Sequence, residues 1–394
     1  MIRIDEIYNN TFWPWIRQHH PGVRLWWCEP FGKTDPDSLV NYGSDDIPEH
    51  NYTLLWDQEP IHLNVHLPTF ESLQEKNYDL FLHWRNEQNT LIKLHRISNW
   101  EPWVVKNKRF GSIITSERDS DNVAAVCEQF GWHSYYYFFH GWAALDWYRG
   151  YNRTFLITPW QQRKITKTFL APNRIVAGER EHRLEMLYWI FKLGMNNNHV
   201  SCPSVCPAEN ISILDAIQPL KNQYPDIEAV FAEQSLPLNF EGETDHPMHS
   251  CWLSLFDQSA ESLLYLVTET VATGRRHHLT EKTFKPIALG MPFVIVGTQG
   301  SLRYLRSYGF RTFGDLWDES YDDEPDDARR IEKIAKVLEL LESLGDDRQA
   351  IFDTAWPIIE HNWNHFYNGG FEKILWQELK DMLNELEFDS GSNS

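Results

Sequence analysis

The 394-residue sequence predicts an α/β protein of two domains, each with a parallel sheet wound between helices. Two observations favour this class. Short apolar segments typical of buried strands alternate along the chain with segments of helical periodicity. One of them, Leu263–Val267, is apolar without interruption, as in a strand buried on both faces of a parallel sheet. The length suits two domains of ordinary size, each with its own core.

The N-terminal part, residues 1–160, is predicted as a loose α/β domain whose helix 121–130 ends at Gly131. Its predicted strands are Val23–Trp27, Tyr52–Trp56, Tyr78–Leu82, Phe110–Thr115 and Tyr135–Phe139. The segment Pro159–Lys164 is predicted to cross into the second domain.

The second domain is predicted to span residues 161–360. A strand from Ile165 ends near Asn173, and a helix follows it and stops at Gly194. After the apolar strand 263–267 come a helix capped by Thr280 and ended by Gly290, the strand 293–296, and a helix begun at 325–327 and ended by residue 345. Further helices are predicted at about 346–362 and 370–387. Residues 361–387 are predicted to return to the first domain, and 388–394 to be disordered.

Polar residues follow both central strands of the second domain. The first strand ends in Thr268–Thr270, and the second ends in a glycine turn, Gly297–Ser301, that offers backbone N–H groups at a helix start. Ligands of open α/β sheets bind outside the carboxyl ends of the strands. These ends are therefore predicted to form a nucleoside-diphosphate site with the following charged side chains: Glu269, Arg275, Arg276, Glu281 and Lys282.

One spacing in this stretch resembles a known family. Glu269 is followed eleven positions later by Thr280-Glu281-Lys282, then by Lys285-Pro286 and the strand entry Gly290–Phe293. This pattern resembles the donor half of GT-B glycosyltransferases, particularly the fucosyltransferase-like and exostosin-like groups and uncharacterised relatives from phages and marine bacteria. The resemblance covers roughly residues 168–345. An alternative interpretation is that Thr280–Lys282 only caps a surface helix.

The resemblance implies a fold of two Rossmann-like domains facing a cleft. It further implies a nucleotide-sugar donor, a glycan or other hydroxyl acceptor, and no cofactor. In these families the glutamate and lysine of the motif face the nucleotide-sugar, which assigns donor contacts to Glu281 and Lys282. The Arg275–His278 insert departs from the fucosyltransferase pattern, so the family's sugar is not carried over.

A second group of cations precedes this stretch. Arg174 stands at a predicted strand end and His182 with Arg183 near a helix start, which also resembles the first βα unit of the donor domain in the phage and bacterial relatives. Fixed cations and a helix dipole can stabilise a diphosphate leaving group without a metal. The remaining predicted donor contacts are Thr280, Lys285, Gly300 and Ser301. No Asp-x-Asp triplet ends an apolar strand, and pairs such as Asp322-Asp323 and Asp326-Asp327 are interpreted as solvated turns or helix starts.

A general base is sought at the strand ends of the first domain, because an acceptor hydroxyl must lose its proton as it attacks. Strands there end in carboxylates followed by proline. The candidates, in order of preference, are Asp57, Glu59 and Glu29. The alternative is that these acids cap turns or pair with arginines.

Composition bounds the remaining functions. A net charge of −20 counts against nucleic-acid and anionic-membrane partners, which attract clustered Lys and Arg. The acidic N-terminus and the lack of an apolar run near ~20 residues predict a cytoplasmic protein without a membrane span. Five scattered cysteines predict reduced thiols rather than a zinc site. The 18 Trp, 16 Tyr and 22 Phe keep a non-catalytic carbohydrate-binding protein open, and a glycosyltransferase acting on DNA bases is the other alternative.

Overall fold

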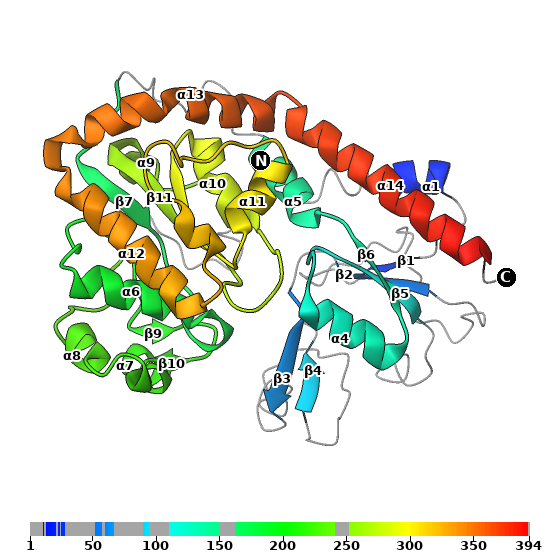
Figure 1. The fold of residues 1–394 in the computed structure, drawn as a ribbon, viewed down its shortest axis with the longest axis horizontal. Coiled ribbons are helices and arrows are strands. Elements are labelled where there is room, and N and C mark those ends of the chain that lie inside the picture. Colours follow the sequence, from blue (N-terminus) through cyan, green and yellow to red (C-terminus); the bar gives the residue numbers. More distant parts are fainter. Residues whose placement is uncertain are drawn as a thin grey trace. The chain divides into compact units, whose positions relative to one another are not determined.

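The computed structural model describes residues 11, 13–20, 23, 25–27, 52–56, 60–66, 90–93, 110–149, 162–240 and 252–392. The chain divides into two compact units (Figure 1). The first consists of Met1–Asp146, Arg275–His278 and Glu372–Ser394, and the second of Trp147–Gly274 and Leu279–Phe371. Each unit holds a four-stranded parallel sheet with helices, so the predicted α/β class is confirmed.

The sheet of the first unit has the strand order β1-β2-β5-β6. Its strands are β1 (Leu25–Trp27), β2 (Tyr52–Trp56), β5 (Phe110–Thr115) and β6 (His133–Tyr136). A separate antiparallel pair is formed by β3 (His62–His66) and β4 (Thr90–Lys93). The prediction of a strand over 135–139 is wrong in its bounds, because Phe139 already begins α5 (Phe139–Tyr148) and donates its N–H to Ser116 Oγ at 3.1 Å. The strand predicted over 78–82 lies outside the described residues.

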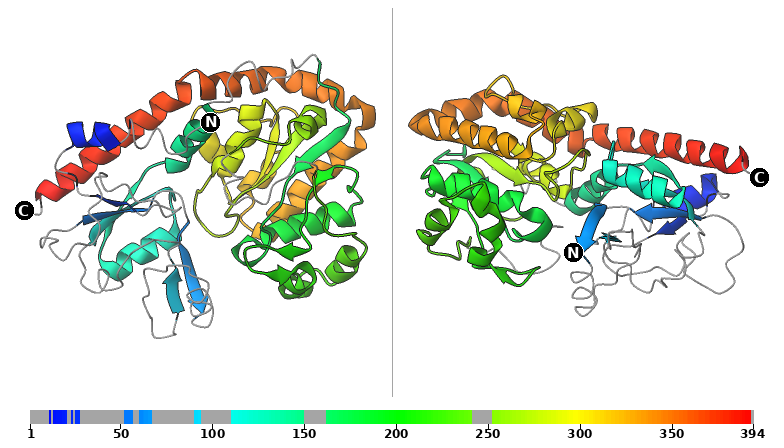
Figure 2. Two further views of the ribbon diagram at one scale, coloured as in Figure 1. Left: turned by 180° about the vertical axis from the view of Figure 1, so that it is seen from behind. Right: turned by 60° about the horizontal axis from the view of Figure 1, so that its bottom comes forward.

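Three further helices belong wholly or mainly to the first unit: α1 (Trp13–His19), α4 (Asp121–Phe130) and α14 (Gly370–Ser392). Helix α4 has the predicted bounds, with Gly131 in the left-handed region at φ 67°, and it lies beside β6 (Figure 2). Helix α14 continues to Ser392, so the segment predicted as disordered from 388 is helical over most of its length. A distant contact explains the difference, since Tyr135 Oη donates to Asp389 Oδ2 at 2.7 Å.

The sheet of the second unit has the strand order β12-β11-β7-β8. Its strands are β7 (Lys167–Ala171), β8 (His199–Val200), β11 (Ser262–Thr268) and β12 (Phe293–Val296). Every residue of β11 and β12 is buried, as the uninterrupted apolar pattern predicts. The smaller elements before β11 are β9 (Val205–Cys206), β10 (Ile211–Ser212), α7 (Ile213–Ala216), α8 (Ile227–Ala232) and α9 (Phe256–Glu261).

Helices pack against β7, β11 and β12 of this sheet. Helix α12 contacts β7, β12 and α6, while α9, α10 and α13 contact β11 (Figure 1). Helix α12 begins within the predicted segment 325–327, and Asp326 caps it by accepting a hydrogen bond from Arg329 N. The bounds of the longer helices are α6 (His182–Lys192), α10 (Glu281–Leu289), α11 (Ser301–Ser307), α12 (Asp327–Ser343) and α13 (Arg348–Tyr367).

Helix α10 is fixed at both ends. Thr280 is its N-cap, and Gly290, at φ 66° in the left-handed region, follows its last residue, as the sequence predicts. The buried Arg163 guanidinium donates to the carbonyls of Leu289 and Gly290 at 2.8 and 2.6 Å. These bonds satisfy carbonyl groups at the helix end that have no partner within the helix. The C-terminal end of α10 is therefore anchored by Arg163.

Candidate functional site

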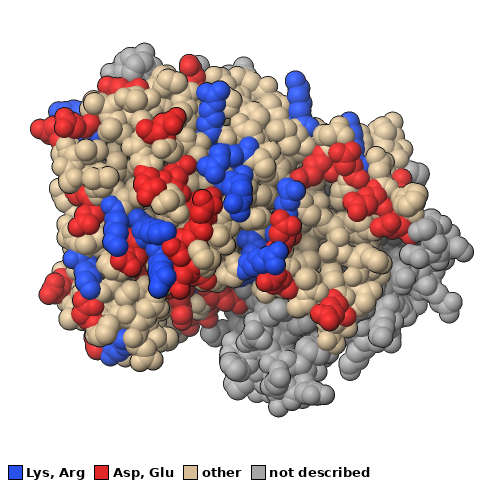
Figure 3. Space-filling view, viewed as in Figure 1, with Lys and Arg blue, Asp and Glu red and all other residues tan. Residues whose placement is uncertain are grey.

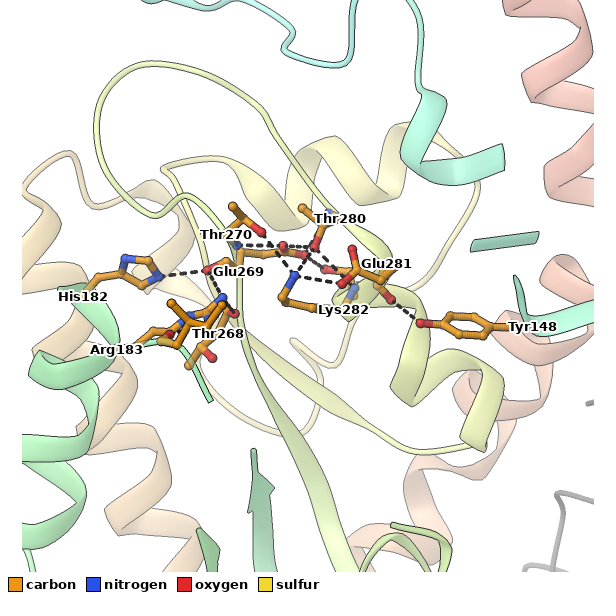
Figure 4. Close-up of polar contacts among 11 residues, drawn as sticks. Tyr148, His182, Arg183, Thr268, Glu269, Thr270, Thr280, Glu281 and Lys282 are labelled. Carbon is orange, nitrogen blue, oxygen red and sulfur yellow. Dashed lines mark hydrogen bonds and ion pairs between the residues drawn. The ribbon is translucent and has the colours of Figure 1, made fainter. Parts of the chain in front are cut away.

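The centre of the site is the carboxylate of Glu269, which follows β11 and is fully buried. Its Oε1 accepts hydrogen bonds from Thr280 N at 3.1 Å and Thr283 Oγ1 at 2.6 Å. Its Oε2 accepts from Thr280 Oγ1 at 2.6 Å and Thr270 N at 3.2 Å (Figure 4). Glu269 therefore joins the end of β11 to the first turn of α10, and its oxygens are engaged by the chain itself.

The Lys282 ammonium lies at this junction with 29% of its side chain exposed. It donates to Glu281 Oε1 at 2.8 Å, Thr270 Oγ1 at 3.2 Å and Thr280 Oγ1 at 3.4 Å (Figure 4). Lys282 is the second residue of α10, close to the positive end of the helix dipole, where a cation is disfavoured and an anion is favoured. The junction thus presents a cation, a helix start and threonine hydroxyls to any anion that reaches it.

Glu281 supplies a carboxylate that pairs with this cation. Its side chain is 6% exposed, and its backbone carbonyl accepts a hydrogen bond from Tyr148 Oη at 3.4 Å. Tyr148 is the last residue of α5 and is itself buried. The first turn of α10 is therefore supported on the side away from Glu269 as well.

His182 and Arg183 hold the end of β11 by its carbonyl groups. His182 Nε2 lies 2.9 Å from Glu269 O, and Arg183 donates to the carbonyls of Ile175, Thr268 and Glu269 at 2.7, 3.0 and 3.0 Å (Figure 4). Burial, aided by the Arg183 charge, lowers the pKa of His182 to about 3, so the imidazole is neutral and donates from Nε2. Both side chains, predicted to face a diphosphate, are instead buried positioning groups.

Three other predicted donor residues lie in different surroundings. Arg174 is half-buried just after β7, the strand next to β11 in the sheet. Lys285 is buried on α10. Arg275, by contrast, belongs to the first unit, where its side chain is 80% exposed and lies 3.9 Å from Asp121.

The insert that carries Arg275 is part of the first unit. His277 and Arg118 exchange backbone hydrogen bonds of 2.8 and 3.0 Å. Arg276 lies 3.4 Å from the buried Glu117 carboxylate and donates to Ile61 O at 3.0 Å. The chain thus leaves the second unit after Gly274 and returns to it at Leu279, just before the N-cap of α10.

The glycine turn after β12 differs from the predicted anion site. Gly300 has the expected left-handed φ of 79°, and Ser301 Oγ donates to Thr298 O at 2.7 Å. The buried Asp322 carboxylate accepts the N–H groups of Leu302 and Arg303 at 2.8 and 3.0 Å. Burial raises the pKa of this carboxyl, and the two N–H groups act in the opposite direction. Asp322, predicted as part of a solvated turn, therefore occupies the position proposed for a phosphate.

A buried arginine that the sequence interpretation missed supports the loops around the site. Arg330 on α12 donates to the carbonyls of Gly297, Ala272 and Glu324 at 2.9, 2.6 and 2.8 Å. It is 2% exposed. The sequence does indicate a buried arginine here, because Arg330 falls on the same helix face as the buried Ile334 and interrupts an apolar stripe.

The three candidate bases, Asp57, Glu59 and Glu29, lie outside the described residues. Among the residues that the structure does describe, no group of three or more His, Cys, Asp or Glu side chains is placed to hold a metal ion. Within the same part of the chain, no helix is long and apolar enough to cross a membrane. Three cysteines there, Cys127, Cys202 and Cys206, are free thiols.

Comparison with known proteins leaves the family open. No protein-family model matches the sequence, and no curated protein matches it significantly. One solved structure is similar to it: a UDP-forming α,α-trehalose-phosphate synthase from Burkholderia xenovorans, with 12% identity and a TM-score of 0.31, over 84% of this chain and 74% of that one.

Proposed function

We propose that the chain is a GT-B-type glycosyltransferase that moves a sugar from a nucleotide-sugar to a hydroxyl acceptor. The observation that carries the proposal is the half-buried Lys282 ammonium at the N-terminus of α10, beside the carboxyl end of β11. This arrangement suits the diphosphate of the donor.

The electrostatics favour an anionic ligand at this position. Lys282 and the positive end of the α10 dipole repel one another, and Glu281 offsets only one unit of positive charge. A diphosphate would interact favourably with both the ammonium and the helix start. Arg174 adds a second cation after the neighbouring strand β7, and the carboxyl ends of parallel strands meet at one edge of a sheet. Such fixed positive groups stabilise charge that develops on a leaving diphosphate.

The proposed reaction follows from this placement. The acceptor hydroxyl oxygen forms a bond to the anomeric carbon, and the bond from that carbon to the diphosphate oxygen breaks. The nucleoside diphosphate leaves with the electron pair, held by Lys282 and Arg174. A carboxylate takes the hydroxyl proton, and Asp57, Glu59 and then Glu29 are proposed for this role. Fixed cations supply the charge stabilisation, so the proposal requires no metal and no cofactor.

The role of Glu281 follows from the same geometry. One of its oxygens pairs with Lys282, and the carboxylate lies at the first position of α10. A carboxylate there can accept hydrogen bonds from hydroxyl groups of the donor while it fixes the ammonium. Glu269, in contrast, is proposed to position this turn without touching the donor, because the chain already engages both of its oxygens.

The proposal is tested by calorimetric titration with nucleoside diphosphates. One of UDP, GDP or ADP should bind, and Lys282→Ala should weaken its binding by roughly 1.5–3 kcal/mol, the contribution of a charge-assisted hydrogen bond. Lys336→Ala is the matched control, since Lys336 is exposed on α12 and pairs with Glu332 in the preceding turn. Equal affinities of the wild type and Lys282→Ala, or no binding of any of the three, would contradict the proposal.

The first of the two alternative functions differs in the same titration, and the second differs in its binding to DNA. A non-catalytic carbohydrate-binding protein would bind sugars and ignore nucleoside diphosphates. A transferase acting on DNA bases would also be retained on DNA in a salt-sensitive manner. Acidic and basic side chains are interspersed over the face drawn in Figure 3, which offers no support for that second alternative.

A further inference from the structure

The insert Arg275–His278 takes no part in the proposed reaction, although it stands within the loop that ends at α10. The second unit breaks off at Gly274 and resumes at Leu279, and the insert between them belongs to the first unit. Leu279 alone separates the insert from Thr280, the N-cap of α10. The insert is therefore close in sequence to the turn that carries Lys282, while a different unit holds it.

Backbone hydrogen bonds attach the insert to the first unit at two points. His277 and Arg118 exchange bonds of 2.8 and 3.0 Å, and Asp121 N donates to Arg275 O at 3.1 Å. Arg118 follows the end of β5, and Asp121 is the first residue of α4. These main-chain bonds fix the path of the insert along the end of β5 and the start of α4.

The Arg276 side chain adds a buried ion pair to this attachment. Its guanidinium is 9% exposed, donates to Ile61 O at 3.0 Å and lies 3.4 Å from the fully buried Glu117 carboxylate. Glu117 also accepts hydrogen bonds from Ile61 N at 2.6 Å and from the hydroxyl of Ser120, the N-cap of α4. Removal of one partner from a buried pair leaves the other charge uncompensated. The attachment of the insert therefore depends on Arg276.

The link from the insert to α10 is too short to absorb much movement. His278 and Thr280 are two positions apart, and a chain spans at most about 3.3–3.6 Å per residue. His278 is buried and packs edge-on against His140 of α5, with ring centres 5.0 Å apart. A shift of the insert is thus passed to Thr280, whose hydroxyl accepts a hydrogen bond from the Lys282 ammonium.

Helix α5 provides a second link of the same kind. It is continuous, yet the boundary of the two units falls within it, between Asp146 and Trp147. His140 near its start packs against the insert, and Tyr148 at its end donates to Glu281 O at 3.4 Å (Figure 4). Two stretches of chain therefore lead from the first unit to the first turn of α10.

We propose that Arg276 is a positioning residue that couples diphosphate binding at Lys282 to the order of the first unit around the insert. A ligand that fixes the first turn of α10 also restricts the insert, and through it the residues that bond to the insert. Such restriction of motion is a recognised way for one site to affect another. The ligand is taken from the proposed function, on which this part rests, whereas the link between the insert and α10 is independent of it.

Hydrogen exchange of the full chain, measured residue by residue with and without UDP, GDP or ADP, tests the proposal. In the wild type, the nucleotide that binds should slow exchange in α10. It should also slow exchange of the Arg118 and His277 amides by about fivefold or more, the lower end of typical coupling between sites. Arg276→Met, saturated with the same nucleotide, should keep the first effect and lose the second.

Arg275→Met is the matched control, because the Arg275 side chain is 80% exposed and lies 3.9 Å from Asp121. It should behave like the wild type. Arg276→Lys, which keeps the charge with fewer donors, should show intermediate slowing, and it carries the test if Arg276→Met does not fold. Nucleotide binding that leaves the Arg118 and His277 amides unchanged in the wild type, or slows them equally in Arg276→Met, would overturn the inference.

A failure of the proposed function gives a different result, since none of the three nucleotides then binds. Glu269→Gln takes the place of the ligand in that case, because it loosens the same turn from within the second unit. Exchange at Arg118 and His277 should become faster in Glu269→Gln than in the wild type. Adding Glu269→Gln to Arg276→Met should have no further effect on these two amides, and an equal acceleration in both backgrounds would overturn the inference.

Discussion

Replacement of Glu269 by glutamine tests whether its buried carboxylate organises the donor site. Its Oε1 accepts hydrogen bonds from Thr280 N and the Thr283 hydroxyl, and its Oε2 accepts them from Thr270 N and the Thr280 hydroxyl. A glutamine amide has the same shape but one acceptor oxygen. Its NH₂ group must therefore face either Thr280 N or Thr270 N, and a backbone N–H cannot rotate away as a hydroxyl can.

The expected cost follows from these contacts. One buried N–H group left without an acceptor costs about 1–3 kcal/mol, and the bonds that remain lose the assistance of the charge. We therefore expect Glu269→Gln to lower the free energy of unfolding of the second unit by about 2–4 kcal/mol. Glu332→Gln, on the exposed face of α12, provides the matched control and should change it by less than about 0.5 kcal/mol.

Urea unfolding followed by circular dichroism measures both variants, and a second transition from the first unit is fitted separately. Nucleoside-diphosphate affinity should fall in Glu269→Gln as well, because the Lys282 ammonium shares Thr280 and Thr270 with this carboxylate. A variant as stable as the control would refute the role of Glu269 as the residue that joins β11 to α10.

Three further changes address the supports of the site and of α13. His182 has a folded pKa of about 3, below its unfolded value near 6.5, so its contribution to stability is present above pH 6.5 and is lost as the pH falls toward 3. Between pH 6.5 and 5 the wild type should lose roughly 2 kcal/mol of its free energy of unfolding through His182. His182→Gln, whose amide donates a hydrogen bond but does not titrate, should not show this loss. Parallel plots of the free energy of unfolding against pH for the variant and the wild type would contradict this. Arg330→Met should destabilise the second unit by about 3 kcal/mol in urea unfolding, because several loop carbonyls lose their donor; an unchanged midpoint would be inconsistent with that role. Gly309→Ala, at φ 87°, would bring a Cβ within 2.8 Å of His365 Nε2. Its melting temperature should therefore fall more than that of the control Gly345→Ala, which is at φ 56° and has open space around the added Cβ. Equal falls in melting temperature would show that the contact with His365 adds no cost.

Local signals explain which elements the sequence could predict. The bounds of α10 follow from a threonine cap and a glycine end, and α12 begins where Asp326 caps it. Strand β11 is predicted because burial on both faces demands an uninterrupted apolar run. These features depend on residues that are close in the sequence.

The features that were missed depend on partners far away in the sequence. The turn at Gly300 looks like an anion site until Asp322, some twenty residues on, takes its N–H groups. The end of α14 has the composition of a disordered tail, but Tyr135 anchors it through Asp389. His182 has the residue type of a ligand contact, and only the folded chain brings it to the carbonyl of Glu269. No local pattern encodes these pairings.

A crystal structure with the bound nucleoside diphosphate and intact chain tests the central claim most directly. The account predicts a phosphate oxygen within hydrogen-bond distance of Lys282 Nζ, at the N-terminus of α10 and beside the end of β11. It also predicts that the Glu269 carboxylate keeps its bonds to Thr280 and Thr283. A diphosphate bound away from Lys282, or in direct contact with Glu269 in place of those threonines, would contradict it.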